Sequence, residues 1–84
     1  MVPLIALEAG QVGFIHALRG GRRLKARLAA LGFTPGAPVT VNRNFGHGPI
    51  IVSVREAQVA LGRGEAGHIW VFQEEKNDAA RTGD

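Results

Sequence analysis

Apolar and polar residues recur along this chain with two different spacings, and the change of spacing marks its elements. Leu24, Leu28 and Leu31 stand at i, i+4 and i+7, which is the spacing of one face of a helix. Gly32 follows them, where the left-handed conformation that ends many helices is most accessible. A Pro35-Gly36 pair then favours a tight turn. The sequence therefore predicts one short helix that ends near Gly32.

Most other apolar residues alternate with polar ones, which is typical of half-buried strands. Because Phe14 and Ile15 are both apolar, the pattern leaves the inward face of the first strand open. Short strands in close succession favour a small barrel, since closure hides strand edges. The predicted fold is mainly β: a small five-stranded β-barrel with one short α-helix between strands 1 and 2. The predicted strands span residues 12–18, 39–43, 50–54, 58–61 and 69–72, with a short turn or 3₁₀ segment at 62–68.

The same alternation predicts a single hydrophobic core. The leucines of the helix face should cover this core as a lid. The strand residues expected in the core are Val41, Val52, Val54, Leu61, Ile69 and Val71, and the residues expected in the lid are Leu24, Leu28 and Leu31.

Aromatic residues are expected on the outside of the barrel. If Ile69 and Val71 face the core, Trp70 and Phe72 face outward, and Phe14 joins them if the first and last strands pair. Exposed apolar clusters usually mark contacts with other chains, so Phe14, Trp70 and Phe72 are candidate partner-binding residues. A second interpretation stays open, in which the C-terminal tail or the N-terminal arm covers them.

Composition limits the class of protein. The 84 residues suffice for one small domain, and a hydrophobic content of 45% argues against disorder. No apolar run approaches the roughly 20 residues of a membrane-spanning helix, and the first residues lack the basic segment of a signal peptide. Cysteine is absent, which excludes disulfides, and a cytoplasmic location is expected. We assign the barrel domain to residues 1–73 and expect the polar tail, 74–84, to be disordered.

Positive charge is concentrated in the domain. The chain has a formal net charge of +3, whereas residues 1–73 hold eight Lys and Arg against three Glu, a balance of +5. A basic surface favours an anionic partner, such as nucleic acid, lipid head groups or an acidic protein. The alternative is that the charge only keeps a small domain soluble.

The beginning of the helix is the most basic segment. Arg22, Arg23 and Lys25 follow two glycines, and no Ser, Thr, Asp or Asn is present to cap the helix. Cations at this end oppose the helix dipole, and a free helix N-terminus attracts anions. We therefore take Arg22, Arg23, Lys25 and the following Arg27 as candidate partner-binding residues. The alternative is an ordinary solvated face.

Catalytic groups form no recognisable arrangement. Ser53 and Thr34 lack a paired His and carboxylate, and the glutamates of the domain are isolated from one another in the sequence. The sequence therefore predicts that the protein is not an enzyme.

The histidines give a weak signal for metal. His16, His47 and His68 are separated by 31 and 21 residues, which matches no local metal motif. Pairing of the first and last strands could bring His16 and His68 near Glu65, and these three residues are weak candidates for transition-metal binding. We expect no dedicated metal site and no cofactor.

Five short motifs stand in order along residues 3–73. They are Pro3-Leu4 through Leu7, Gly10-Gln11-Val12-Gly13, Gly20-Gly21 followed by Leu24, Arg27 and Leu28, Leu31-Gly32-Phe33-Thr34-Pro35-Gly36, and Val59-Ala60-Leu61-Gly62-Arg63-Gly64-Glu65-Ala66 followed by Ile69 and Val71. Together they resemble the FeoA family, the small cytosolic accessory proteins of bacterial ferrous iron uptake. The resemblance implies a Src-homology-3-like (SH3-like) barrel that binds and regulates FeoB, the GTPase-linked membrane transporter. It implies no metal ligands at the histidines.

Two other functional classes stay open. A small basic barrel could bind nucleic acid, but we expect none, because the aromatic residues do not interleave with the basic cluster. A related domain also ends some metal-dependent repressors, although no helix-turn-helix segment precedes the barrel here. The oligomeric state is also open, and a weak homodimer is compatible with the exposed aromatic residues.

Overall fold

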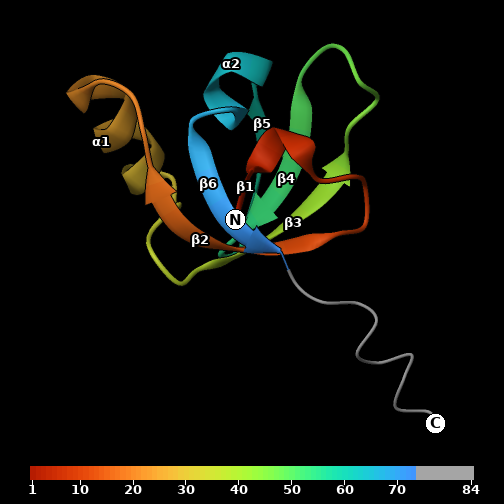
Figure 1. Cartoon of the computed structure of the whole chain (residues 1–84), viewed down its shortest axis with the longest axis horizontal. Coiled ribbons are helices and arrows are strands. Elements are labelled where there is room, and N and C mark those ends of the chain that lie inside the picture. The colour runs from red at the N-terminus through yellow and green to blue at the C-terminus, as the bar shows by residue number, and fades with distance from the viewer. Residues whose placement is uncertain (74–84) are drawn as a thin grey trace, which may run out of the picture.

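The computed structural model describes residues 1–73 and consists of one curved antiparallel sheet with helices at its margins (Figure 1). The strands join in the order β1-β6-β2-β3-β4-β5, so the last strand of the sequence lies between the first two. The expected disordered tail, 74–84, lies outside the described residues. The elements are β1 (Val2–Pro3), the 3₁₀ helix η1 (Leu4–Ala6), β2 (Val12–Leu18), α1 (Arg22–Ala30), β3 (Pro38–Arg43), β4 (Ile50–Val54), β5 (Ala57–Leu61), α2 (Arg63–Ala66) and β6 (Ile69–Gln73).

The five predicted strands are all present, and the helix lies between the first two of them, as expected. The predicted number of strands was wrong, because β1 adds a sixth. β1 has only two residues, which is too short to show an alternating pattern, and it pairs with Val71 and Trp70 of β6. The turn expected at residues 62–68 contains α2, a short α-helix of four residues.

The core lies on the concave side of the sheet. All six predicted core residues of the strands are confirmed, since none is more than 1% exposed. Ile15 is also buried while its neighbour Phe14 is exposed, which resolves the inward face of β2. The sequence pattern missed Leu4, Leu7 and Phe33, which enter the core from the N-terminal arm and from the loop after α1.

The end of α1 explains why the prediction that Leu31 covers the core was wrong. Gly32 has φ +111°, and its N–H donates to the Ala29 carbonyl at 3.0 Å, while the Phe33 N–H donates to the Leu28 carbonyl at 3.1 Å. This pair of bonds is a Schellman motif, which reverses the chain and directs Phe33 into the core beside Leu28. Leu31 is therefore left at the helix end and is 38% exposed.

The other two lid residues face the core as expected. Leu28 is fully buried, and Leu24 is partly buried against the core. Within residues 1–73 neither α-helix has the length and apolar character needed to cross a membrane.

Candidate protein-interaction surface

An aromatic surface lies on the outer face of β2 and β6. The two strands pair directly, and their register places Phe14 opposite Phe72. Phe14 is 39% exposed and Phe72 is 51% exposed, while Trp70 on the same face is half-buried. The predicted outward direction of these aromatic side chains is confirmed; their role in partner binding stays a prediction.

A histidine and an arginine accompany these aromatic rings, and the spacing of residues in the sequence gives no signal for either contact. The β2 to β6 register shifts between Ile15 and Ala17, and His16 lies at this irregularity. The His16 and Phe72 rings pack in a T-shaped arrangement, with a centroid distance of 4.8 Å. The Arg19 guanidinium lies 5.2 Å from the centroid of the Trp70 ring, within cation–π range. We use the name aromatic surface for Phe14, His16, Arg19, Trp70 and Phe72.

The N-terminal arm leaves Phe14 and Phe72 of the aromatic surface exposed. Leu4 is fully buried in the core, and Ile5 packs partly against the same core. Phe72 stays more than half exposed with the arm in this place. Cover by Leu4 and Ile5 is therefore wrong, although Pro3 of the same arm lies opposite the half-buried Trp70. Cover by the tail lies outside the described residues.

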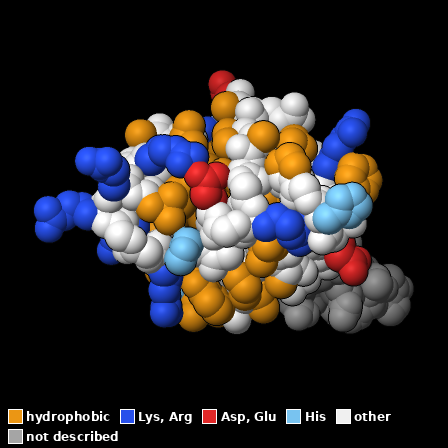
Figure 2. Space-filling view, turned by 90° about the horizontal axis from the view of Figure 1, so that it is seen from above, with side chains coloured by type: hydrophobic (Ala, Val, Ile, Leu, Met, Phe, Trp, Pro, Cys, Tyr) orange, Lys and Arg blue, Asp and Glu red, His pale blue; other side chains and the backbone are white. Residues whose placement is uncertain are grey.

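A basic surface surrounds the beginning of α1. The helix follows Gly21, which provides no side-chain cap, and its first turn contains no acidic residue. Arg22, Arg23 and Lys25 are all exposed. Lys and Arg side chains project around this end of the molecule, at the left of Figure 2. We use the name basic surface for Arg22, Arg23 and Lys25.

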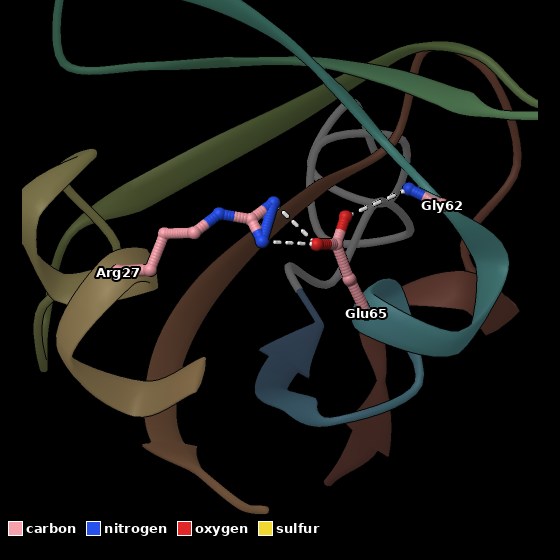
Figure 3. A network of polar contacts seen from close by, with 3 residues as sticks. All are labelled: Arg27, Gly62 and Glu65. Carbon is pink, nitrogen blue, oxygen red and sulfur yellow. Dashed lines mark hydrogen bonds and ion pairs between the residues drawn. The ribbon is translucent and has the colours of Figure 1, made fainter. Parts of the chain in front are cut away.

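Arg27 differs from the other three cations because it pairs within the chain. Both of its terminal guanidinium nitrogens donate to Oε2 of Glu65 on α2, and Oε1 of the same carboxylate accepts the Gly62 N–H at 3.0 Å (Figure 3). The pair is partly exposed, with 54% of the Arg27 side chain and 26% of the Glu65 side chain accessible. Arg27 thus has a structural partner of its own, which sequence spacing could not indicate.

The three weak metal candidates are not gathered into one site. Glu65 is occupied by Arg27 and Gly62, and the His16 ring packs against Phe72. His68 lies beside Arg19, whose backbone N–H donates to the His68 carbonyl at 2.8 Å. Within residues 1–73 no three His, Cys, Asp or Glu side chains are placed to share a metal ion.

Comparison with known proteins identifies the family of this barrel. A model of the FeoA domain matches residues 2–72 of the chain. The chain belongs to the FeoA family. A curated protein of Methanocaldococcus jannaschii whose name refers to Fe(2+) transport protein A is 32% identical over 71 residues, which cover 84% of this chain and 85% of the relative. The family places the chain among small accessory proteins of ferrous iron transport, and the family is not a known enzyme family.

Solved FeoA structures share the whole barrel. A crystal structure of an iron uptake regulatory protein, FeoA, has a TM-score of 0.82 and 36% identity, with coverage of 87% of this chain and 97% of that chain. The FeoA protein of Chlorobium tepidum has a TM-score of 0.81 and 27% identity, with coverage of 88% and 71%. The zinc-complexed FeoA of Stenotrophomonas maltophilia, described as a prokaryotic SH3 domain protein, has a TM-score of 0.78 and 24% identity, with coverage of 90% and 99%. The fold of this FeoA-family chain is therefore an SH3-like barrel.

The barrel also occurs as a part of transcriptional regulators. A manganese-dependent transcriptional repressor aligns with a TM-score of 0.76 and 26% identity over 86% of this chain, but over only 41% of the repressor. The FeoA proteins align over most of both chains, so the FeoA assignment describes this chain better.

Proposed function

We propose that this protein is a cytoplasmic accessory protein of ferrous iron uptake that acts by binding FeoB, and that the basic surface contacts an acidic region of that transporter. The observation that carries the proposal is the position of Arg22, Arg23 and Lys25, which are exposed at the positive end of α1 with no acidic residue in the same turn. Membership of the FeoA family supports a role in ferrous iron uptake, and the electrostatics of α1 support the basic surface as the site of contact.

The helix dipole gives this surface a reason to bind an anion. The N-terminus of a helix carries a partial positive charge, and each cation placed there is unfavourable by about 0.3–1 kcal/mol. Among the charged residues of the described chain, an ion pair occurs for Arg27 but for none of the three cations of the basic surface. An acidic surface on another protein would offset the repulsion, and complementary charge of this kind raises both specificity and the rate of association.

The fold also determines which side of α1 is available. Leu28 is fully buried and Leu24 partly buried, so these leucines hold the helix against the barrel. Arg27 is bound to Glu65 and fixes the helix to α2. The polar flank formed by Arg22, Arg23 and Lys25 is left for the partner. Arg19 of the aromatic surface lies three residues before α1 in the sequence and packs on Trp70, and the aromatic surface supplies an apolar contact area in addition to the charge.

A pull-down with the cytosolic and membrane parts of FeoB, tested separately, examines the proposal. We expect Arg22→Glu/Arg23→Glu to lose binding to one of the two parts while the barrel stays folded, because glutamates suit this end of a helix. A matched control uses two single variants, Arg23→Glu on α1 and Arg43→Glu on β3, which change the charge by the same amount at exposed positions. We expect Arg23→Glu to weaken binding and Arg43→Glu to leave it unchanged. Unchanged binding by the double variant would contradict the proposal. Loss of salt-sensitive binding to single-stranded nucleic acid, with FeoB binding intact, would favour the nucleic-acid class instead.

A further inference from the structure

The two edges of the sheet are protected to different degrees. β1 has only two residues and contains a proline, Pro3, so it offers little backbone for pairing. β5, at the other edge, has five residues, Ala57–Leu61, with no proline, no charged side chain and a continuous register with β4. Natural proteins usually protect an exposed edge by short length, proline, lysine or a bulge. β5 has none of these features.

Within residues 1–73, the outer edge of β5 carries backbone groups without partners. A two-residue turn, Arg55-Glu56, connects β4 to β5, and the pairing begins with Val54 opposite Ala57. Alternate residues of an antiparallel strand direct their N–H and C=O groups to the neighbouring strand, so Gln58 and Ala60 direct theirs away from β4. Both residues are exposed. Within the described chain, no hydrogen bond outside the β4 ladder involves the backbone of β5.

We propose that β5 pairs with β5 of a second copy of this chain, antiparallel and about a twofold axis at Val59. Gln58 and Ala60 lie symmetrically on either side of this axis. The N–H and C=O of Gln58 then meet the C=O and N–H of Ala60 of the partner subunit, and the twofold axis repeats the same bonds on the other side. All outward backbone groups of Gln58 and Ala60 are satisfied in this one register.

The side chains of β5 also suit pairing with themselves. Val59 meets its own copy at the axis, Ala57 lies opposite Leu61, and no two like charges oppose each other along the strand. The arginines beyond the two ends of β5 are directed at their own chain: Arg55 donates to the Thr34 hydroxyl, and Arg63 donates to Oδ1 of Asn44. The outward backbone groups could pair with any extended segment. We assign the edge to a second copy because β5 is itself an uncharged, proline-free strand and every copy of the chain presents it.

This pairing goes beyond the proposed contact with the transporter. It leaves both the basic surface and the aromatic surface free, because they lie on α1, β2 and β6. The dimer would present each surface twice, and a partner with two matching sites would bind it more tightly through avidity. A contact made by one strand buries less than the roughly 1,200–2,000 Å² of a stable interface, so we expect a weak dimer that dissociates on dilution.

A pair of single-cysteine variants tests the register directly, because the chain contains no cysteine of its own. In the proposed dimer, the two copies of residue 59 form a non-hydrogen-bonded pair with Cα atoms about 4.5 Å apart, which a disulfide can span. The two copies of residue 57 lie roughly 13 Å apart, which it cannot. Under oxidised glutathione, Val59→Cys should therefore form a covalent dimer several times faster than Ala57→Cys. Random collision would give the opposite order, because Ala57 is more exposed than Val59.

Equal or faster dimerisation of Ala57→Cys would overturn the proposal, as would a Val59→Cys protein that stays monomeric. A second measurement uses sedimentation velocity at high protein concentration. Ala60→Pro removes the outward N–H and should abolish the dimer, whereas Ala60→Ser keeps this N–H and should preserve it. An Ala60→Pro protein that is folded, by the near-ultraviolet circular dichroism of Trp70, and still dimeric would also overturn the proposal. If Ala60→Pro does not fold, the comparison of the two cysteine variants decides.

Discussion

Arg27 and Glu65 join the two α-helices of the barrel although they lie 38 residues apart in the sequence. One oxygen of the Glu65 carboxylate accepts both guanidinium bonds, and the other accepts the Gly62 N–H at the start of α2. Glu65 therefore holds two groups in place, while Arg27 holds one. The pair fixes α1 to the barrel without using any residue of the basic surface.

The first prediction compares the two members of this pair. Arg27→Ala should lower the free energy of unfolding by at most about 1 kcal/mol, because the pair is partly exposed. Glu65→Ala should lower it by about 1 kcal/mol more, since the acceptor for a helix-capping N–H is also lost. Glu65→Gln keeps that acceptor and should fall between the two. Urea denaturation measures all three variants, and a greater loss for Arg27→Ala than for Glu65→Ala would contradict the assignment.

The second prediction concerns two leucines of the same helical repeat. Leu28→Ala should destabilise the protein by about 2–5 kcal/mol, because Leu28 is fully buried beside Phe33. Leu31→Ala should change stability by only about 0.5 kcal/mol, because Leu31 is exposed at the helix end. Thermal unfolding of the two variants checks this difference. Similar losses would mean that Leu31 also packs against the core.

The third prediction is that folding does not require metal. The His and Glu side chains of residues 1–73 form no cluster that could hold a structural ion. The circular dichroism spectrum and the melting temperature should therefore be the same in excess chelator as in buffer. Loss of structure on chelation would contradict this, and so would submicromolar Fe²⁺ or Zn²⁺ binding that is abolished by changing His16 or His68.

The fourth prediction concerns the aromatic surface. Trp70→Thr/Phe72→Gln should weaken partner docking and leave the barrel folded, because both side chains face away from the core. Ile51→Thr on the outer face of β4 provides a control, as Ile51 is also half-buried but lies on a different part of the sheet. The interaction is measured by retention of FeoB on the immobilised variants. Unfolding of the double variant would show instead that the aromatic residues support the core.

Patterns of local spacing predicted most of the fold. Val52 and Val54 belong to a strand whose alternation is strict, so their buried positions follow from a period of two alone. Leu31 fits the helical spacing equally well, but this spacing places a side chain on the core face only where the helix continues to that residue. Gly32 in the left-handed conformation and the buried Phe33 end α1 before Leu31 can reach the core.

Other features depend on contacts between distant segments and have no local signal. β1 forms because Val2 and Pro3 pair with the edge of β6, which is distant in the sequence. The pairing of Arg27 with Glu65 and the contact of Arg19 with Trp70 arise only when the barrel brings α1, α2, β2 and β6 together. The sequence could therefore show which cations stand at the beginning of α1, but not which cation of that helix is already paired.

The dissociation constant for FeoB, measured at several salt concentrations for the wild type and for Arg22→Glu/Arg23→Glu, tests the central proposal most directly. The proposal predicts that wild-type binding weakens steadily as salt rises, because the distance over which exposed charges attract one another shortens from about 10 Å at 0.1 M ionic strength to about 3 Å at 1 M. It also predicts that the double variant binds weakly at every salt concentration, with a melting temperature equal to or above that of the wild type, because glutamates suit this end of the helix. Equal affinity and equal salt dependence of the two proteins would contradict the proposal and leave the basic surface as a solvated face.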